Sequence, residues 1–153
     1  KYDGAFCTVD TFRHLLSEKQ AEQHLITIAK ALKKNALYII GLHLIPEKVV
    51  LNKITSWTSR RGRLTVKTTM TMLKLDKKKR TETLKVVLKT NNQKETHASI
   101  YKLRTYTLKQ IIKLLDKTSV FEVFKVYDEY YDLPNPVTLN SKSEYAVLLL
   151  RKK

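Results

Sequence analysis

The sequence is poor in the residues on which several kinds of protein depend. Its 153 residues include one cysteine, three glycines and three prolines. The single cysteine, Cys7, excludes a framework of disulfides within the chain and is typical of a protein in a reducing compartment. Cys7 lies in the apolar run GAFCTV, where a buried, unreactive thiol is more common than a nucleophile.

Signals for membrane crossing and secretion are also missing. No apolar run approaches the length of a membrane span, and no segment resembles a signal peptide. We therefore expect no membrane partner and a cytoplasmic location, with the nucleus as a second candidate.

Patterns that mark several enzyme classes are absent as well. No Ser-His-Asp, Cys-His or paired-carboxylate arrangement stands out, so nothing supports a hydrolase. The three glycines stand too far apart to form a glycine-rich loop that grips a phosphate or a cofactor. The four histidines have no metal-ligand spacing, so we expect no metal site. They are His14, His24, His43 and His97.

Acidic residues are scarce beside basic ones, and the net charge is +16. Residues 60–125 carry eighteen Lys or Arg against five Asp or Glu, which is most of this excess. Such a field can steer an anionic partner, so nucleic acid is a candidate partner for residues 60–117. The alternative is a solvated, lysine-rich surface. We favour that alternative because the charges alternate with strand-forming residues instead of clustering on one helix.

Residues 1–50 predict a βαβ unit. The stretch YDGAFCTVD (2–10) is rich in strand formers. The stretch ALYIIGLHLI (36–45) is a near-continuous apolar run, as expected of a strand in a parallel sheet that is covered on both faces. The apolar residues between these two strands recur at helical spacing.

The intervening helix has clear ends in the sequence. Ser17 is the predicted N-cap, and Gln20 three residues later completes a capping box. Lysines up to Lys34 suit the C-terminal end of the helix dipole. Asn35 is then expected to end the helix in a left-handed conformation.

Residues 60–107 predict an antiparallel β insertion. The runs 63–75, 80–90 and 95–107 are dense in Thr, Val and Ile, and turn-like segments separate them. Alternation in the first run predicts a meander with one covered face and one lysine-bearing face in water.

Residues 108–153 predict a helix followed by a closing β-hairpin. Thr107 is the expected N-cap of a helix over 107–117, whose leucines and isoleucines share one side. A strand over 120–132, a loop with two prolines and a final strand over 144–153 follow. Because the chain is expected to turn back after the first of these strands, we expect the last two strands to pair as an antiparallel hairpin.

In this order, the segments resemble the C-terminal half of class I S-adenosylmethionine-dependent methyltransferases. YDGAFCTVDTFRHL resembles the family's fourth strand and its loop, and HLITIAKALKKNALYIIGLHL resembles the next helix and the fifth strand. LRTYTLKQIIKLLDKTSVFEVFKVYDEYYD and YAVLLLRKK resemble the closing helix and strands. The resemblance covers most of 1–50 and 101–153. It implies an α/β fold, with a Rossmann-like doubly wound sheet and an inserted antiparallel β-meander.

Two features depart from the family pattern. The Pro-Gly-Gly turn before the fifth strand is replaced by Lys34-Asn35-Ala36. The glycine-rich loop that holds the cofactor, and the acidic residue that binds its ribose, have no counterpart in the chain. We therefore expect 1–153 to be a half-domain, completed by the N-terminal half of the same fold or by a partner chain.

The resemblance also implies site residues for the cofactor. Thr8, Val9, Asp10 and Thr11 follow the first strand, and ligands bind at the carboxyl ends of strands in such sheets. They would therefore lie along S-adenosylmethionine. Their alternative role is loop and cap chemistry, which stays open.

The methyl acceptor would meet a second set of residues. His14 and His43 are candidates for a base or an orienting group, against a structural role. Inserted strands in this family often cover the active site, so 60–107 would form a substrate cap. Candidates for the lid and acceptor pocket are Trp57, Arg60, Arg61, Arg104 and Tyr106. Packing of the rings and solvation of the arginines are the alternative.

The resemblance thus implies methyl transfer from S-adenosylmethionine to a small-molecule or protein acceptor, with no catalytic residue assigned. We expect the cofactor to bind well only together with the N-terminal half. The alternative is a non-catalytic methyltransferase-like subunit whose basic strands bind nucleic acid or an acidic protein.

Overall fold

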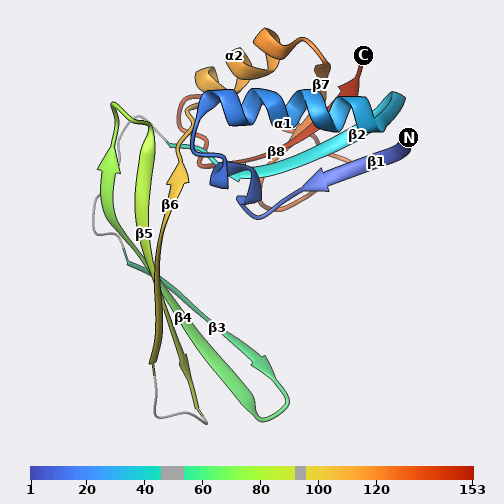
Figure 1. Ribbon diagram of the computed structural model, residues 1–153. Coiled ribbons are helices and arrows are strands. Elements are labelled where there is room, and N and C mark those ends of the chain that lie inside the picture. Colours follow the sequence, from blue (N-terminus) through green and yellow to red (C-terminus); the bar gives the residue numbers. More distant parts are fainter. Residues whose placement is uncertain (46–53, 92–95) are drawn as a thin grey trace. The chain divides into compact units, whose positions relative to one another are not determined.

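The computed structural model describes residues 1–45, 54–91 and 96–153. Figure 1 shows the elements that these residues form. In chain order they are β1 (Tyr2–Cys7), the 3-10 helix η1 (Thr11–His14), α1 (Glu18–Ala31), β2 (Leu32–His43), β3 (Ile54–Arg61), β4 (Leu64–Asp76), β5 (Thr81–Thr90), β6 (Thr96–Arg104), α2 (Leu108–Thr118), β7 (Phe121–Tyr127) and β8 (Tyr145–Lys152). No helix in the described ranges is long and apolar enough to cross a membrane.

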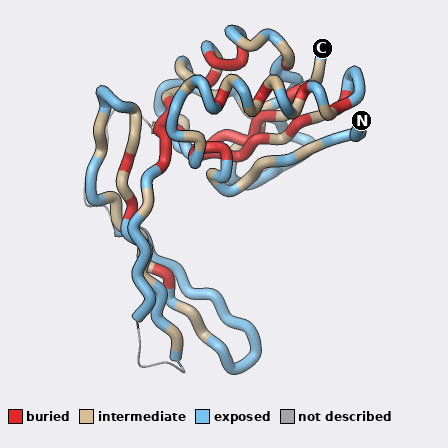
Figure 2. The backbone as a smooth tube through the Cα atoms, in the orientation of Figure 1, coloured by how far each residue is buried: buried red, intermediate tan, exposed pale blue. Residues whose placement is uncertain are grey.

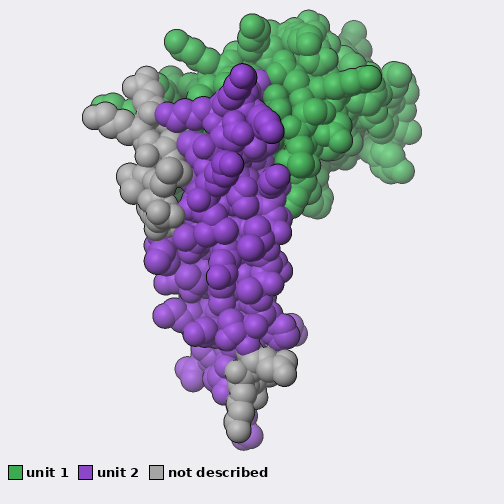
Figure 3. Space-filling view, turned by 60° about the vertical axis from the view of Figure 1, so that its left-hand side comes forward, with its two compact units in different colours: residues 1–49, 104–153 green, residues 50–103 purple. Residues whose placement is uncertain are grey.

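The chain folds as two compact units. Unit 1 comprises residues 1–49 and 104–153, and unit 2 comprises residues 50–103 (Figure 3). Buried residues gather in α1, β2, α2 and β8 of unit 1, whereas most of the described backbone of unit 2 is exposed or intermediate (Figure 2).

Unit 1 is built on a four-stranded sheet of order β1-β2-β8-β7. β1 and β2 are parallel and joined through α1, which confirms the predicted βαβ unit. β8 is antiparallel to both β2 and β7, with Ile40 and Val126 each opposite Leu148, which confirms the predicted hairpin. Within the described part of the chain, β1 pairs with β2 alone and leaves its other edge open.

Both helices of unit 1 begin as the sequence predicts. Ser17 caps α1 and Thr107 caps α2, and each forms a complete capping box with the glutamine three residues on. The end of α1 was predicted wrongly, because it stops at Ala31 and not at Lys34. Leu32 already pairs with Tyr2 of β1, so sheet formation overrides the last helical turn.

Asn35 nevertheless adopts the predicted left-handed conformation, with φ of 62°. It lies in β2, where the register with β1 shifts between Leu32 and Leu37. The residue therefore forms part of a bulge in the strand and not a helix cap.

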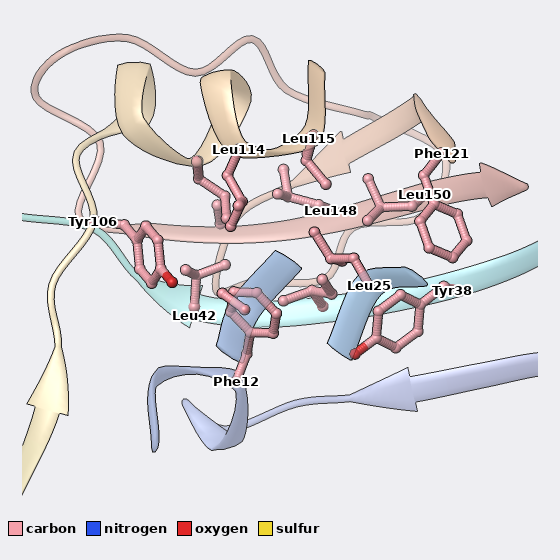
Figure 4. Packing of buried hydrophobic residues seen from close by; sticks show 14 of the residues in the cluster. Phe12, Leu25, Tyr38, Leu42, Tyr106, Leu114, Leu115, Phe121, Leu148 and Leu150 are labelled. Atoms are coloured by element: carbon pink, nitrogen blue, oxygen red, sulfur yellow. The ribbon is translucent and has the colours of Figure 1, made fainter. Parts of the chain in front are cut away.

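The core of unit 1 lies between the two helices and one face of the sheet. Figure 4 shows Leu25 of α1 and Leu114 and Leu115 of α2 packed with Leu148 and Leu150 of β8. A smaller cluster of Tyr127, Tyr145 and Val147 lies on the opposite face, with Ile39 and Leu149 packed against it. Alternate residues of β2 and β8 thus enter two separate clusters.

Unit 2 is a four-stranded sheet of order β3-β4-β5-β6, with β3–β4 and β4–β5 antiparallel. β3 was missed by the sequence prediction, which gave three strands. Trp57, Thr68 and Leu88 lie opposite one another and share one face. Lys67 and Lys89 lie opposite each other on the other face and are exposed. The lysine-bearing face lies in water as predicted. The prediction that the opposite face is covered was wrong, because Trp57 and Leu88 on that face are 47% and 38% exposed.

Candidate functional site

The carboxyl ends of β1 and β2 meet at one edge of the unit 1 sheet, because the two strands are parallel. After Cys7 the chain leaves β1 through Val9 and Asp10, whose φ values of 54° and 62° are both left-handed. The Asp10 N–H donates to the Gly41 carbonyl oxygen of β2 at 3.1 Å, and η1 begins directly afterwards. The turn after β1 is therefore fixed against the end of β2.

The Asp10 carboxylate joins three hydrogen bonds at this edge. Its Oδ1 accepts from the His43 N–H at 2.7 Å and from the Arg13 guanidinium at 3.1 Å, and its Oδ2 lies 2.7 Å from His43 Nδ1. Burial tends to raise the pKa of Asp10, but the hydrogen bonds from His43 and the charge of Arg13 lower it to about 2. Asp10 is therefore a carboxylate at neutral pH.

Two tyrosines complete the edge. The His43 ring meets the Tyr145 ring edge-on, with centroids 4.8 Å apart. The Tyr145 hydroxyl lies 3.3 Å from that of Tyr131, and burial together with this hydrogen bond raises the pKa of Tyr145. A Cβ at Gly41 would lie 2.8 Å from the Tyr145 hydroxyl, so the absence of a side chain at Gly41 makes room for this phenol.

The Arg13 side chain is buried and forms a hydrogen bond with the backbone of Arg104. Its side chain is 3% exposed, and its Nε donates to the Arg104 carbonyl oxygen at 2.9 Å. The Arg104 guanidinium donates to the Leu16 carbonyl oxygen at 3.0 Å and lies 3.3 Å from a Glu18 carboxylate oxygen. These contacts favour a structural role for Arg104 over contact with a substrate.

The other predicted acceptor residues are dispersed. Tyr106 is fully buried beside Phe12 in the core, which favours packing (Figure 4). His14 is exposed at the end of η1. Trp57 and Arg61 lie on β3 in unit 2, so the site described above consists of unit 1 residues alone. Their contact with an acceptor stays a prediction.

Two of the five side chains described at this edge were predicted from the sequence, and three were not. Asp10 and His43 were predicted at the same sheet edge, whereas Arg13, Tyr131 and Tyr145 were not assigned a role. The spacing of Asp10 and Arg13 by three residues is a local signal that was available, because such residues face each other across one helical turn. Tyr145 requires the register of β8 against β2, which a sequence does not give.

No three His, Cys, Asp or Glu side chains of the described residues form a group that could hold a metal ion. The expectation of a site without metal stays a prediction.

Comparisons with solved structures show that the chain has a known fold. The chain is similar to an S-adenosylmethionine-dependent methyltransferase from Clostridium acetobutylicum ATCC 824, with a TM-score of 0.74 at 13% identity, over 99% of this chain and 58% of that one. It is also similar to the CcbJ methyltransferase from Streptomyces caelestis, with a TM-score of 0.72 at 11% identity, over 100% of this chain and 61% of that one. No family model and no curated protein matches the sequence.

A third similar structure is CalS10 with S-adenosylmethionine bound, an amino pentose methyltransferase from Micromonospora echinaspora, with a TM-score of 0.69 at 10% identity. The similarity extends over 99% of this chain and 58% of CalS10. The fold is that of S-adenosylmethionine-dependent methyltransferases. The chain spans about three fifths of the length of the methyltransferases that it matches.

Within this methyltransferase fold, Asp10 and His43 lie at the carboxyl ends of the two parallel strands. This is the edge where open α/β sheets bind their ligands. The doubly wound arrangement was predicted as well. In the described residues, however, both helices of unit 1 pack on the same face of the sheet.

Proposed function

We propose that this chain is the C-terminal part of an S-adenosylmethionine-dependent methyltransferase that acts on a small-molecule or protein acceptor. The observation that carries the proposal is the polar edge at the ends of β1 and β2, where Asp10, Arg13 and His43 are joined by hydrogen bonds of 2.7–3.1 Å. A purely structural sheet end does not require an ionised carboxylate and an imidazole that is more than half exposed.

The residues of this edge fit the cofactor chemically. Thr8 to Thr11 form the turn, with Val9 79% exposed and the Asp10 carboxylate close behind it. S-adenosylmethionine combines an apolar adenine ring with a positively charged sulfonium group. An exposed apolar side chain beside a negative charge suits both. When bound, the cofactor supplies the methyl group, and this turn would hold it.

The cofactor site would be completed by a further part of the same fold. β1 leaves one edge unpaired in the described residues, and Phe6, on the face opposite the helices, is 78% exposed. A strand paired to this edge, with helices over this face, would cover Phe6 and make the sheet doubly wound. The glycine-rich loop absent from this chain would belong to that part, which is either the N-terminal half or a partner chain. The role of residues 60–107 as a substrate cap stays part of the proposal.

Calorimetric titration of the full-length protein with S-adenosylmethionine tests the proposal. The expected result is saturable binding, which Thr11→Arg weakens by about tenfold or more, since the added charge and bulk oppose a cationic ligand. Thr27→Arg is the matched control, because Thr27 is exposed on α1 and plays no part in this site.

Absence of binding to the full-length protein would contradict the proposal. If that protein instead bound RNA or DNA with an affinity that falls as salt is added, a non-catalytic role for the basic strands of unit 2 would replace it. Equal effects of the two arginine substitutions would move the cofactor away from the turn after β1.

A further inference from the structure

We propose that His43 is the general base of the methyl transfer, with Nε2 as the atom that takes the proton, and that Asp10 is its positioning residue. The proposal rests on the proposed function and deepens it, because it specifies the acceptor. The acceptor would be a group that must lose a proton, namely a hydroxyl or a protonated amine.

The hydrogen bonds fix which ring nitrogen of His43 carries the proton. Asp10 Oδ2 lies 2.7 Å from Nδ1, and an ionised carboxylate can only accept. Nδ1 is therefore the donor, and the neutral ring presents a lone pair on Nε2. In the described part of the chain no hydrogen bond reaches Nε2, and the side chain is 57% exposed. The arrangement leaves Nε2 open to an incoming group.

The ring is also held in one orientation. The two oxygens of Asp10 bind the His43 backbone N–H and the ring Nδ1, so a single carboxylate holds both the backbone and the ring of this residue. The Tyr145 ring packs edge-on against the imidazole. A base whose direction is set before the acceptor arrives avoids reorganisation during the reaction.

Charged and titratable groups around His43 suit a base. Asp10 stabilises the imidazolium that forms when Nε2 takes a proton. Arg13, from η1, keeps Asp10 ionised, so the proton remains on His43. Tyr145 of β8 and Tyr131 beyond it are phenols that face the same edge, and Tyr145 stays neutral because its pKa is raised.

The proton transfer completes the chemistry of the step. The acceptor's O–H or N–H bond breaks, its proton passes to Nε2, and the freed electron pair forms the new bond to the methyl carbon. The carbon–sulfur bond breaks, and its electrons remain on the sulfur of the departing thioether. A thioether carries no proton on its sulfur, loses none when methylated and would have no need of His43.

A structural role for the pair is separable from a catalytic one. His43→Asn keeps the backbone N–H and places an amide donor near the position of Nδ1, but it has no atom at Nε2. With tyramine, which offers a phenol and an amine, and radiolabelled cofactor, this variant should lose about a hundredfold or more in kcat. Its melting temperature and cofactor affinity should match those of the unsubstituted protein. Equal rates of methyl transfer in the two proteins, both above the background without enzyme, would overturn the proposal.

Nitrogen NMR of the full-length protein labelled at histidine tests the pair even where tyramine is a poor acceptor. In alkaline solution, where imidazole rings are neutral, the His43 signals should show a proton on Nδ1 and none on Nε2, and Asp10→Asn should abolish this preference. A proton on Nε2 in the unsubstituted protein would overturn the proposal. Because this measurement uses no cofactor, its failure is distinct from a failure of cofactor binding in the calorimetry.

Discussion

Units 1 and 2 are both four-stranded sheets, but they bury their side chains differently. In unit 1, two helices cover one face of the sheet, and eighteen buried residues form its main cluster. In unit 2, the buried side chains among the described residues are Thr68, Glu82, Leu84 and Leu103. Hydrophobic burial therefore stabilises unit 1 strongly, whereas unit 2 depends more on its ladder of backbone hydrogen bonds.

The difference shows what each kind of sheet can support. A site that must hold atoms within a few tenths of an ångström needs a rigid base, and the Asp10–His43 pair lies on the densely packed unit. The exposed lysines and threonines of unit 2 suit a surface that contacts water or a partner. The following substitutions test this contrast, beginning with the largest expected effect.

Leu148→Ala and Leu88→Ala form a matched pair in central strands of the two sheets. Leu148 is fully buried, so its truncation should lower the free energy of unfolding by about 3 kcal/mol. Leu88 is 38% exposed, and its loss should cost about 1 kcal/mol or less. Urea unfolding measures both.

The two units have separate optical probes. Both helices belong to unit 1 and dominate the far-UV circular dichroism, whereas Trp57, the single tryptophan, reports on unit 2 by fluorescence. Leu148→Ala should shift mainly the first signal and Leu88→Ala mainly the second. Equal losses of unfolding free energy in the two variants would contradict the difference in packing between units 1 and 2.

The Asp10 carboxylate should make the stability of unit 1 depend on pH. Its pKa falls from the ordinary 3.8 to about 2 on folding, which corresponds to about 2 kcal/mol. Because the folded-state pKa is the lower one, this contribution is complete above pH 3.8 and disappears as the pH falls toward 2. Asp10→Asn should therefore be less stable than the unsubstituted protein at neutral pH, and the gap should close in acid.

Urea unfolding of both proteins across this pH range makes the measurement. Asp116→Asn is the control, because Asp116 is exposed near the end of α2. A gap that stays constant down to the lowest pH would show that the pKa of Asp10 is not lowered.

The capping boxes of unit 1 should contribute moderately. Ser17→Ala removes the side-chain oxygen that accepts from the Gln20 N–H at 3.2 Å, and should cost about 1 kcal/mol. Thermal unfolding followed by circular dichroism measures the loss. Ser17→Thr keeps the oxygen and should retain most of the stability.

The smallest effect concerns like charges in unit 2. Lys67 and Lys89 lie directly opposite each other on β4 and β5, where like charges repel. Lys89→Glu should raise the free energy of unfolding by about 0.2–1 kcal/mol, as followed by the fluorescence of Trp57. Added salt should shrink the gain. A loss of stability would show that the repulsion is negligible.

Features that depend on a few adjacent residues were predicted well from the sequence. Ser17 with Gln20 and the N-cap at Thr107 each require only one helical turn, and both form as expected. The antiparallel hairpin and the parallel pair around α1 followed from element order and apolar runs. These were sufficient to place Asp10 and His43 at one edge.

Features that depend on distant partners were predicted poorly. β3 carries the mixed sequence ITSWTSRR, and it is a strand because it pairs along its length with β4. Leu32 leaves the helix because Tyr2, thirty positions earlier, pairs with it. The position of Tyr145 beside His43 depends on a strand that arrives a hundred residues later. No local pattern encodes such pairings.

At Val9, the stability of the fold and the proposed binding of the cofactor favour different residues. Its φ of 54° places a β-branched side chain where it crowds the backbone, at a cost of about 1–2 kcal/mol that glycine would avoid. Directed evolution toward heat resistance alone should therefore replace Val9 with glycine early. Selection for cofactor capture should retain the valine, because its exposed side chain lies in the turn that we assign to the cofactor. The strained conformation of Val9 would then indicate that this position has been selected for ligand binding at the expense of stability.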